Sequence, residues 1–195
     1  MAKFLTMLSG LAAAAFLIIP NVTQADDLDD PFNELHCGWP ISLSPIGAGN
    51  VQGPDSASRY WIMPLDTTNY RAMTIRGAYP EVRYFSISVY DATVVDGQNV
   101  FSVAANLYDA EIVPDKGGAN PFVSDGNGTY TVVVSRTPPS SGNVLKVNSD
   151  LVWVALRFYV ADADPSLGGK SLTGHVPLPV VTLTDRYGNT GKPLD

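Results

Sequence analysis

The sequence has very little cysteine or histidine, with 1 Cys and 2 His in 195 residues. One cysteine forms no internal disulfide, so packing has to hold the fold together. His36 and His175 are too far apart to show the ligand spacing of a transition-metal site. A Cys37–His175 dyad lacks any surrounding nucleophile motif, and no G-x-S-x-G stretch occurs. We therefore predict no metal and no cofactor, assign no catalytic residue, and favour a non-enzymatic protein.

Charge, and positive charge in particular, is also scarce. Charged residues make up 16% of the chain, and the formal net charge is −7. Without a basic stripe to neutralise phosphates, the sequence does not predict a nucleic-acid partner. No Lys/Arg cluster indicates binding to an anionic membrane surface either. The composition leaves the oligomeric state open.

No apolar run is long enough for a spanning helix, which needs about 20 residues. The longest run, from Leu5 to Ile19, follows Lys3 and is broken by Pro20. Small residues then precede an acidic stretch, which is typical of a secretory signal peptide cleaved after Ala25. We expect a periplasmic or secreted protein with no membrane insertion after cleavage.

Glycine and proline are abundant, at 17 and 15 residues, and a period of two in hydrophobicity begins at Arg59. About seven or eight short segments alternate in this way between turn signals, and none has a helical period. This pattern predicts one all-β domain over residues 59–195, an antiparallel β-sandwich or jelly roll. The expected strands are 59–64, 70–76, 82–91, 100–104, 129–136, 151–162 and 176–185, with a weaker apolar segment before residue 151.

Residues 26–58 are rich in Asp, Pro, Gly and Ser, which predicts an irregular segment. Its apolar residues, Trp39 and Ile41 among them, indicate that it packs on the domain rather than forming a free tail. One helical turn is expected over residues 31–36.

Three stretches carry a family resemblance: YWIMPLDTTNYRAMTIRGAYPEVRYFSISVYD, PDKGGANPF and RFYVADADPSLGGKSLTGHVPLPVVTL. In this order, over residues 59–184, they resemble a family of uncharacterised bacterial exported proteins. More distantly, they resemble a C-terminal jelly-roll domain of unknown function. The resemblance implies a secreted β-sandwich and no particular activity. Relatives tend to have a second glycine where this chain has His175, so the resemblance implies no family-wide catalytic role for it.

Two strands predict a surface of unusual chemistry. In RYFSISVYD, Phe85, Ile87 and Val89 alternate with Tyr and Ser, and in LVWVALRFYV a continuous Val/Leu/Phe face alternates with Trp, Arg and Tyr. The aliphatic faces are core, and the opposite faces merge into one surface if the strands share a sheet. Aromatic rings stack on sugars and other flat ligands, while Arg and Ser orient polar groups. The candidate ligand-binding residues are Arg76, Tyr84, Tyr90, Trp153, Arg157 and Tyr159.

Several alternatives remain open. The surface is plain structure if residues 26–58 cover it, with Trp39 or Trp61 docked on it, since Tyr and Trp favour strands for packing reasons alone. If the protein is instead an enzyme, we expect its active-site cleft at the end of the sandwich, between the PDKGGANPF loop and the loop before VPLP. The polar residues expected in that cleft are Arg76, Asp115, Asn120 and His175. An envelope structural subunit would instead use the aromatic surface as a protein interface. Weaker candidates are calcium at 125–129 or 162–164 and a glycosidase pair among Glu81, Asp91 and Asp109.

Overall fold

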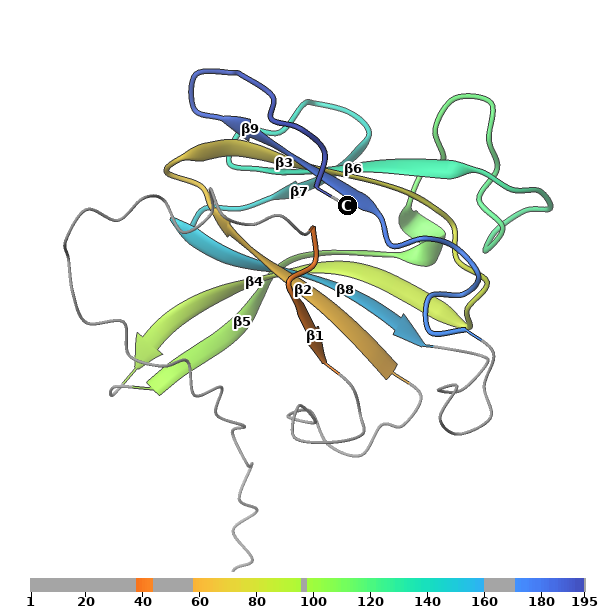
Figure 1. Cartoon of the computed structure of the whole chain (residues 1–195), viewed down its shortest axis with the longest axis horizontal. Helices are drawn as coiled ribbons and strands as arrows, with labels where there is room; N and C mark the ends of the chain where they lie inside the picture. The colour runs from red at the N-terminus through yellow and green to blue at the C-terminus, as the bar shows by residue number, and fades with distance from the viewer. Residues whose placement is uncertain (1–37, 44–57, 96–97, 160–170, 195) are drawn as a thin grey trace, which may run out of the picture.

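The computed structural model describes residues 38–43, 58–95, 98–159 and 171–194, shown in colour in Figure 1. Within these ranges the chain forms strands and one short 3-10 helix, η1 (Asp109–Glu111), and no α-helix. The prediction of an all-β sandwich is confirmed. The strands are β1 (Ile41–Leu43), β2 (Ser58–Asp66), β3 (Tyr70–Ala78), β4 (Tyr84–Val95), β5 (Gln98–Tyr108), β6 (Thr129–Ser135), β7 (Asn143–Lys146), β8 (Leu151–Tyr159) and β9 (Val180–Asp185).

Two sheets lie face to face (Figure 1). Sheet A has the order β1-β2-β8-β4-β5 and is the lower layer in Figure 1, and sheet B has the order β7-β6-β3-β9. All pairings are antiparallel except that of β6 with β7, which is parallel. The β2–β3 turn and the β3–β4 connection each carry the chain from one sheet to the other, at opposite ends of the sandwich.

The core fills the space between the sheets, because alternate side chains along each strand point inward and most of these are apolar. Sheet A contributes Phe85, Ile87 and Val89, each 0% exposed, as the sequence predicted. Sheet B faces them with Met73 and Ile75, also 0% exposed. Rings of Phe85 and Phe158 pack edge to face at 6.0 Å. The inner faces of both sheets are therefore assigned, and this fixes which side chains point outward.

Strand β1 was not predicted, because it lies in the segment expected to be irregular. It pairs with β2 at the edge of sheet A, with Leu43 opposite Tyr60. Just before it, Trp39 is buried, and its Nε1 donates to the carbonyl of Pro179 at 2.8 Å. The described part of this segment thus packs on the domain. The rest of it, the expected helical turn and the predicted signal peptide lie outside the described residues.

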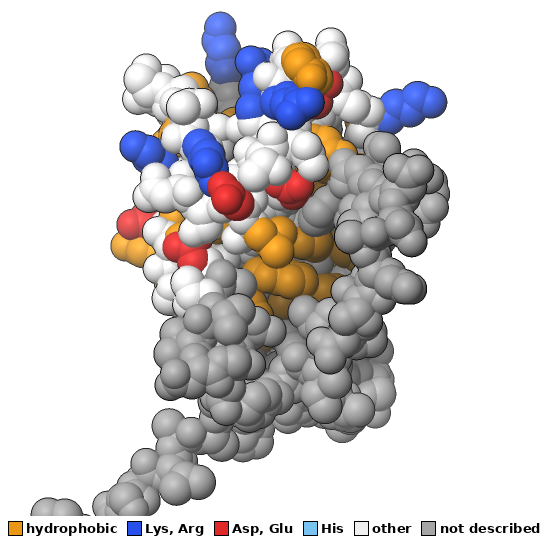
Figure 2. Space-filling view, turned by 90° about the vertical axis from the view of Figure 1, so that its left-hand side faces the viewer, with side chains coloured by type: hydrophobic (Ala, Val, Ile, Leu, Met, Phe, Trp, Pro, Cys, Tyr) orange, Lys and Arg blue, Asp and Glu red, His pale blue; other side chains and the backbone are white. Residues whose placement is uncertain are grey.

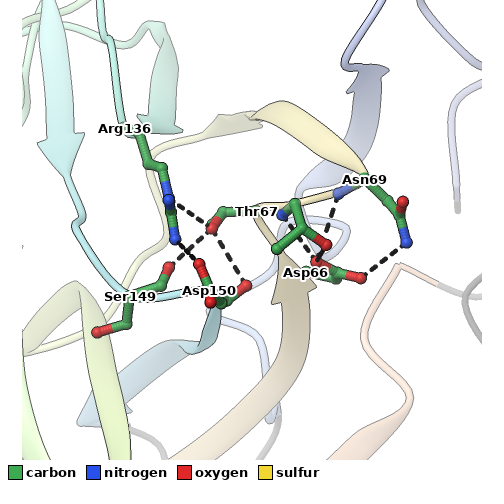
Figure 3. Close-up of polar contacts among 7 residues, drawn as sticks. Asp66, Thr67, Asn69, Arg136, Ser149 and Asp150 are labelled. Atoms are coloured by element: carbon green, nitrogen blue, oxygen red, sulfur yellow. Dashed lines mark hydrogen bonds and ion pairs between the residues drawn. The ribbon is translucent and has the colours of Figure 1, made fainter.

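A polar cluster joins the two sheets at the β2–β3 turn (Figure 3). The Thr67 hydroxyl donates to the carbonyl of Ser149 at 2.7 Å and accepts from Arg136 Nε at 2.8 Å. Arg136 also forms an ion pair with Asp150. Next to this inter-sheet cluster, the Asp66 carboxylate accepts hydrogen bonds from the Thr68 and Asn69 backbone and side chains. These hydrogen bonds and the ion pair link the two sheets at this end of the sandwich.

The β4–β5 hairpin extends beyond the rest of sheet A, toward the lower left of Figure 1. Pairing of β4 with β8 ends at Asp91 opposite Val152, while β4 and β5 continue to pair up to Val95. A bulge between Val89 and Tyr90 shifts their register. Residues 100–104 of β5 are exposed as a result.

Candidate functional site

The outward side chains of the two predicted strands lie on one surface, because β4 and β8 are neighbours in sheet A. Tyr84 lies opposite Tyr159, Ser86 opposite Arg157, Ser88 opposite Ala155 and Tyr90 opposite Trp153. The large side chains of this set are half-buried. Five of the six candidate residues, Tyr84, Tyr90, Trp153, Arg157 and Tyr159, therefore share the outer side of sheet A, which we call the aromatic face.

Arg76 does not belong to this face, because β3 is in sheet B. It is exposed on the opposite side of the molecule, where its Nε donates to the Thr131 hydroxyl at 3.4 Å. The Tyr70 ring, also on β3, packs against the core. Sequence periodicity alone did not identify the sheet to which the strand carrying Arg76 belongs.

The neighbouring strands β2 and β5 add further residues to the aromatic face, and the sequence analysis had not identified these as candidates. On β2, Tyr60 lies opposite Arg157 and Pro64 opposite Trp153. On β5, Tyr108 lies opposite Ser86, Asn106 opposite Ser88 and Val103 opposite Tyr90. The face therefore spans four hydrogen-bonded strands.

Arg157 is the centre of one aromatic group on this face. Its guanidinium carbon lies 4.6 Å from the Tyr159 ring centroid and 5.3 Å from that of Tyr60, both within cation–π range. Its Nη2 also donates to the Tyr159 hydroxyl at 2.8 Å. The Tyr84 and Tyr159 rings meet edge to face at 6.0 Å. These contacts hold the rings in a fixed arrangement.

The titration of Tyr60 reflects the same crowding. Burial raises the pKa of the Tyr60 hydroxyl, the positive charge of Arg157 opposes this rise, and the nearby Tyr90 and Tyr159 hydroxyls add to it. The net direction is upward, since burial disfavours the phenolate.

A second aromatic group lies at the other end of the face. The Trp153 and Phe101 rings meet edge to face at 6.4 Å. Phe101, Val103 and Leu151 are exposed by 38%, 61% and 41%. Figure 2 shows hydrophobic side chains gathered at this end of the molecule, below a rim of acidic and basic side chains. This group is the more apolar of the two.

Small side chains separate the two aromatic groups. Ser86, Ser88 and Ala155 are exposed by 2%, 8% and 2%, so they form a floor below the level of the rings. The Ser88 hydroxyl donates to Asn106 Oδ1 at 2.6 Å. This bond orients the exposed Asn106 side chain so that its amide group remains a donor.

The proposal that Trp39 or Trp61 docks on this face is wrong. Both belong to the core, where the Trp61 ring packs against Phe158 at 5.2 Å. Coverage of the face by the remainder of residues 26–58 falls outside the described residues.

The alternative cleft has a partial counterpart in the structure. The loop of PDKGGANPF and the first residue of VPLP line one cleft, through Pro121, Phe122 and Val176. The polar residues expected there do not converge. Asn120 is 2% exposed and donates to the carbonyls of Asp109 and Ile112, so it holds its own loop together. The Asp115 carboxylate accepts from the Thr129 hydroxyl at 2.8 Å.

The other candidate catalytic and metal-binding residues do not form a site in the described parts of the chain. Asp109 is buried and accepts from the backbone N–H groups of Phe85 and Ala110, which is a structural role. Glu81 precedes β4, whereas Asp91 lies well along it, so these acids do not form a glycosidase pair. Across the described ranges no group of three or more His, Cys, Asp or Glu side chains is arranged to hold a metal ion. Cys37 and residues 162–164 lie outside those ranges.

Comparisons with known proteins give little further information. No protein-family model matches the chain, and no curated protein matches it. A solved structure of an uncharacterised protein from Burkholderia cenocepacia is similar at a TM-score of 0.48 and 17% sequence identity. The match covers 80% of this chain and 38% of that one, so this chain spans less than half of its length. None of the described helices is long and apolar enough to cross a membrane. The family resemblance stays a prediction.

Proposed function

We propose that this protein is an exported, non-enzymatic β-sandwich that binds a carbohydrate on its aromatic face. The observation that carries this proposal is the register of β2, β8 and β4, which gathers Tyr60, Tyr84 and Tyr159 around Arg157 and places Tyr90 and Trp153 further along the same face. Ring faces and edges fixed on rigid strands offer contact area at little entropic cost. The predicted signal peptide supports the exported location.

The polar groups on the face suit a ligand with many hydroxyls. The Tyr84 hydroxyl both donates and accepts hydrogen bonds, and the Asn106 amide donates. Arg157 contributes donors directed by its contacts with Tyr60 and Tyr159. A sugar ring presents apolar C–H faces to the aromatic rings and hydroxyls to these groups.

The spacing of the two aromatic groups indicates an extended ligand. Arg157 and Trp153 are four residues apart on β8, which corresponds to ~13 Å along a strand. An oligosaccharide is therefore a better match than a single sugar.

A small amphiphile is a second candidate, favoured by one observation. Phe101 and Val103 on the projecting hairpin are exposed by 38% and 61% and offer no side-chain hydrogen-bonding group. An acyl or aromatic tail would cover these residues, while its polar head would lie toward Arg157.

Tryptophan fluorescence distinguishes these ligands. Of the 3 tryptophans in the sequence, Trp39 and Trp61 are in the core and Trp153 is on the face. We expect a saturable change in emission of the purified protein when it is titrated with cell-wall oligosaccharides. Tyr159→Ala should weaken binding about tenfold, because it removes a ring that also orients Arg157. Thr131→Ala, on sheet B, is the matched control and should leave binding unchanged.

Two outcomes would redirect the proposal. Saturation with lysolipids or detergents, but not with oligosaccharides, would select the amphiphile. No response to any of these ligands, together with a folded Trp153→Ala variant that behaves like the native protein, would exclude the face as a small-molecule site and leave a protein interface.

A further inference from the structure

A cleft of about 450 Å³ lies at the end of the sandwich where the chain crosses from β3 to β4. This is the opposite end from the inter-sheet cluster of Figure 3. None of the aromatic-face residues lines it. The lining residues are Ala78, Tyr79, Pro80, Glu81, Val82, Pro121, Phe122, Asn127, Gly128 and Val176.

The inner wall of this cleft is an aromatic cluster that is already fixed in place. The Tyr79 ring contacts Phe122 at 6.4 Å, Phe85 at 6.1 Å and Tyr130 at 5.3 Å. Its hydroxyl donates to the Ile112 carbonyl at 2.7 Å, so it is not available to a ligand. With Pro80 and Pro121 beside it, this wall offers a rigid apolar surface.

The rim is formed by Glu81, which the loop before VPLP holds closely. Glu81 N–H donates to the Gly174 carbonyl at 2.8 Å. A Cβ on Gly174 would lie 2.7 Å from Val82 Cγ1 and 2.8 Å from Glu81 N, so only glycine permits this approach. His175 follows with a φ of +61°, the only positive φ among the described non-glycine residues. Its Nδ1 lies 3.1 Å from Glu81 Oε2.

The electrostatics of the cleft favour positive charge. Glu81 is the one charged side chain among the lining residues, which include no Lys or Arg. Asp115 adds negative charge nearby. Burial and the Asp115 charge together raise the pKa of Tyr79 to about 12. The net charge of −7 strengthens this bias.

We propose that this cleft binds a small organic cation with an apolar body, such as a protonated amine. The ammonium group would lie against the Glu81 carboxylate, and the apolar body against Phe122, Pro80 and Pro121. A carboxylate beside aromatic rings is the arrangement that recognises organic cations, through ion pairing and cation–π attraction. His175 is a positioning residue that orients the carboxylate. The site is independent of the carbohydrate proposal.

Backbone NMR of the purified protein tests this directly with 2-phenylethylamine and its uncharged analogue 2-phenylethanol. We expect saturable amide shifts over residues 79–82 and 121–128 with the amine, and binding at least about tenfold weaker with the alcohol. Glu81→Gln keeps the size of the side chain and should lower amine affinity to that of the alcohol. Glu111→Gln removes an exposed carboxylate outside the cleft, keeps an oxygen that accepts from the Tyr108 N–H, and should leave the amine affinity unchanged.

The unaltered spectrum of Glu81→Gln away from the cleft would show that it folds, since this side chain is 78% exposed. Equal affinity for amine and alcohol would overturn the proposal, as would an amine affinity unaffected by Glu81→Gln. Absence of saturable shifts at the cleft with the amine would overturn it as well.

Discussion

The outer faces of the two sheets are made of different residues, although both belong to strands of the same domain. Sheet A turns outward the rings of Tyr60, Tyr84, Tyr90, Trp153 and Tyr159. The outward residues of sheet B include Ala72, Thr74, Arg76, Thr129, Thr131, Val133, Val144, Lys146, Val180, Thr182 and Thr184, and none of these is aromatic. Threonine and valine with an occasional cation are typical of a strand surface that only meets solvent.

This difference bears on why the rings are present. If strand propensity alone placed tyrosine and tryptophan, rings would occur on both outer faces. Sheet B shows that this chain builds a stable outer strand surface without them. The aromatic content of sheet A therefore indicates a specific role for that face, and sheet B supplies matched controls for testing it.

The largest expected difference between the faces is in ligand binding. The double variant Tyr84→Ala/Trp153→Ala removes one ring from each aromatic group and should weaken oligosaccharide binding about 100-fold, since each ring contributes roughly 1–2 kcal/mol. Thr74→Ala/Thr182→Ala changes the outer face of sheet B and should leave the affinity unaltered. Isothermal titration calorimetry measures the oligosaccharide affinity of both double variants. Equal losses for the two double variants would remove the distinction between the faces.

The next effect is on stability and compares two outward arginines. Arg157→Ala removes contacts with two tyrosine rings and a hydrogen bond to Tyr159. It should lower the free energy of unfolding by about 1–2 kcal/mol. Arg76→Ala loses one long hydrogen bond at the surface and should change the free energy of unfolding by less than about 0.5 kcal/mol. Urea denaturation measures the free energy of unfolding of both variants. A similar loss of stability in the two would mean that the contacts of Arg157 with the tyrosine rings do not stabilise the fold.

A smaller effect should be visible at alkaline pH. The folded-state pKa of Tyr60 is raised, so its stabilising contribution is complete below the usual tyrosine pKa of about 10 and is lost as pH rises through the folded value. Tyr60→Phe should therefore reduce the alkaline decline in the urea midpoint. Thr182→Val on sheet B introduces no change in titratable groups and serves as the control. A decline of the same steepness in Tyr60→Phe would contradict this expectation.

The smallest effect concerns the turn beside the inter-sheet cluster. Burial raises the pKa of Asp66, but hydrogen bonds from Thr68 and Asn69 outweigh this and leave it lowered. Its contribution is thus present above the unfolded pKa near 4 and lost as pH falls through the folded value. Asp66→Asn should flatten part of the acid decline in thermal stability. Oligosaccharide affinity at neutral pH should not change, because this turn lies outside the aromatic face. A changed affinity would show that the turn and the aromatic face are energetically coupled.

Period-two alternation was enough to predict the sandwich and the core faces of β4 and β8. Here one face of each strand is clearly more aliphatic, as with Phe85, Ile87 and Val89. Alternation does not identify which sheet a strand joins. Arg76 was grouped with Tyr84 for that reason, although β3 and β4 belong to different sheets.

Tyr60 was missed because both faces of β2 are apolar. Tyr60, Ile62 and Pro64 alternate with Trp61, Met63 and Leu65, so nothing in the sequence shows which set is core. β1 was missed because three residues are too few to show a period. The β5 residues Phe101, Val103 and Asn106 could be placed on the face only once pairing with β4 and its bulge were known.

Strand order also determines when the aromatic face can form. β8 lies between β2 and β4, yet it is the last strand of sheet A in the chain. Before residues 151–159 dock, β2 and β4 have no hydrogen-bonded neighbour in common, and Tyr60 cannot lie beside Tyr84. Such pairing between distant segments slows folding, because a long loop must close before its contacts contribute. Insertion of β8 should thus be a late, rate-limiting event, and a chain that ends before Leu151 should have neither sheet A nor its binding face.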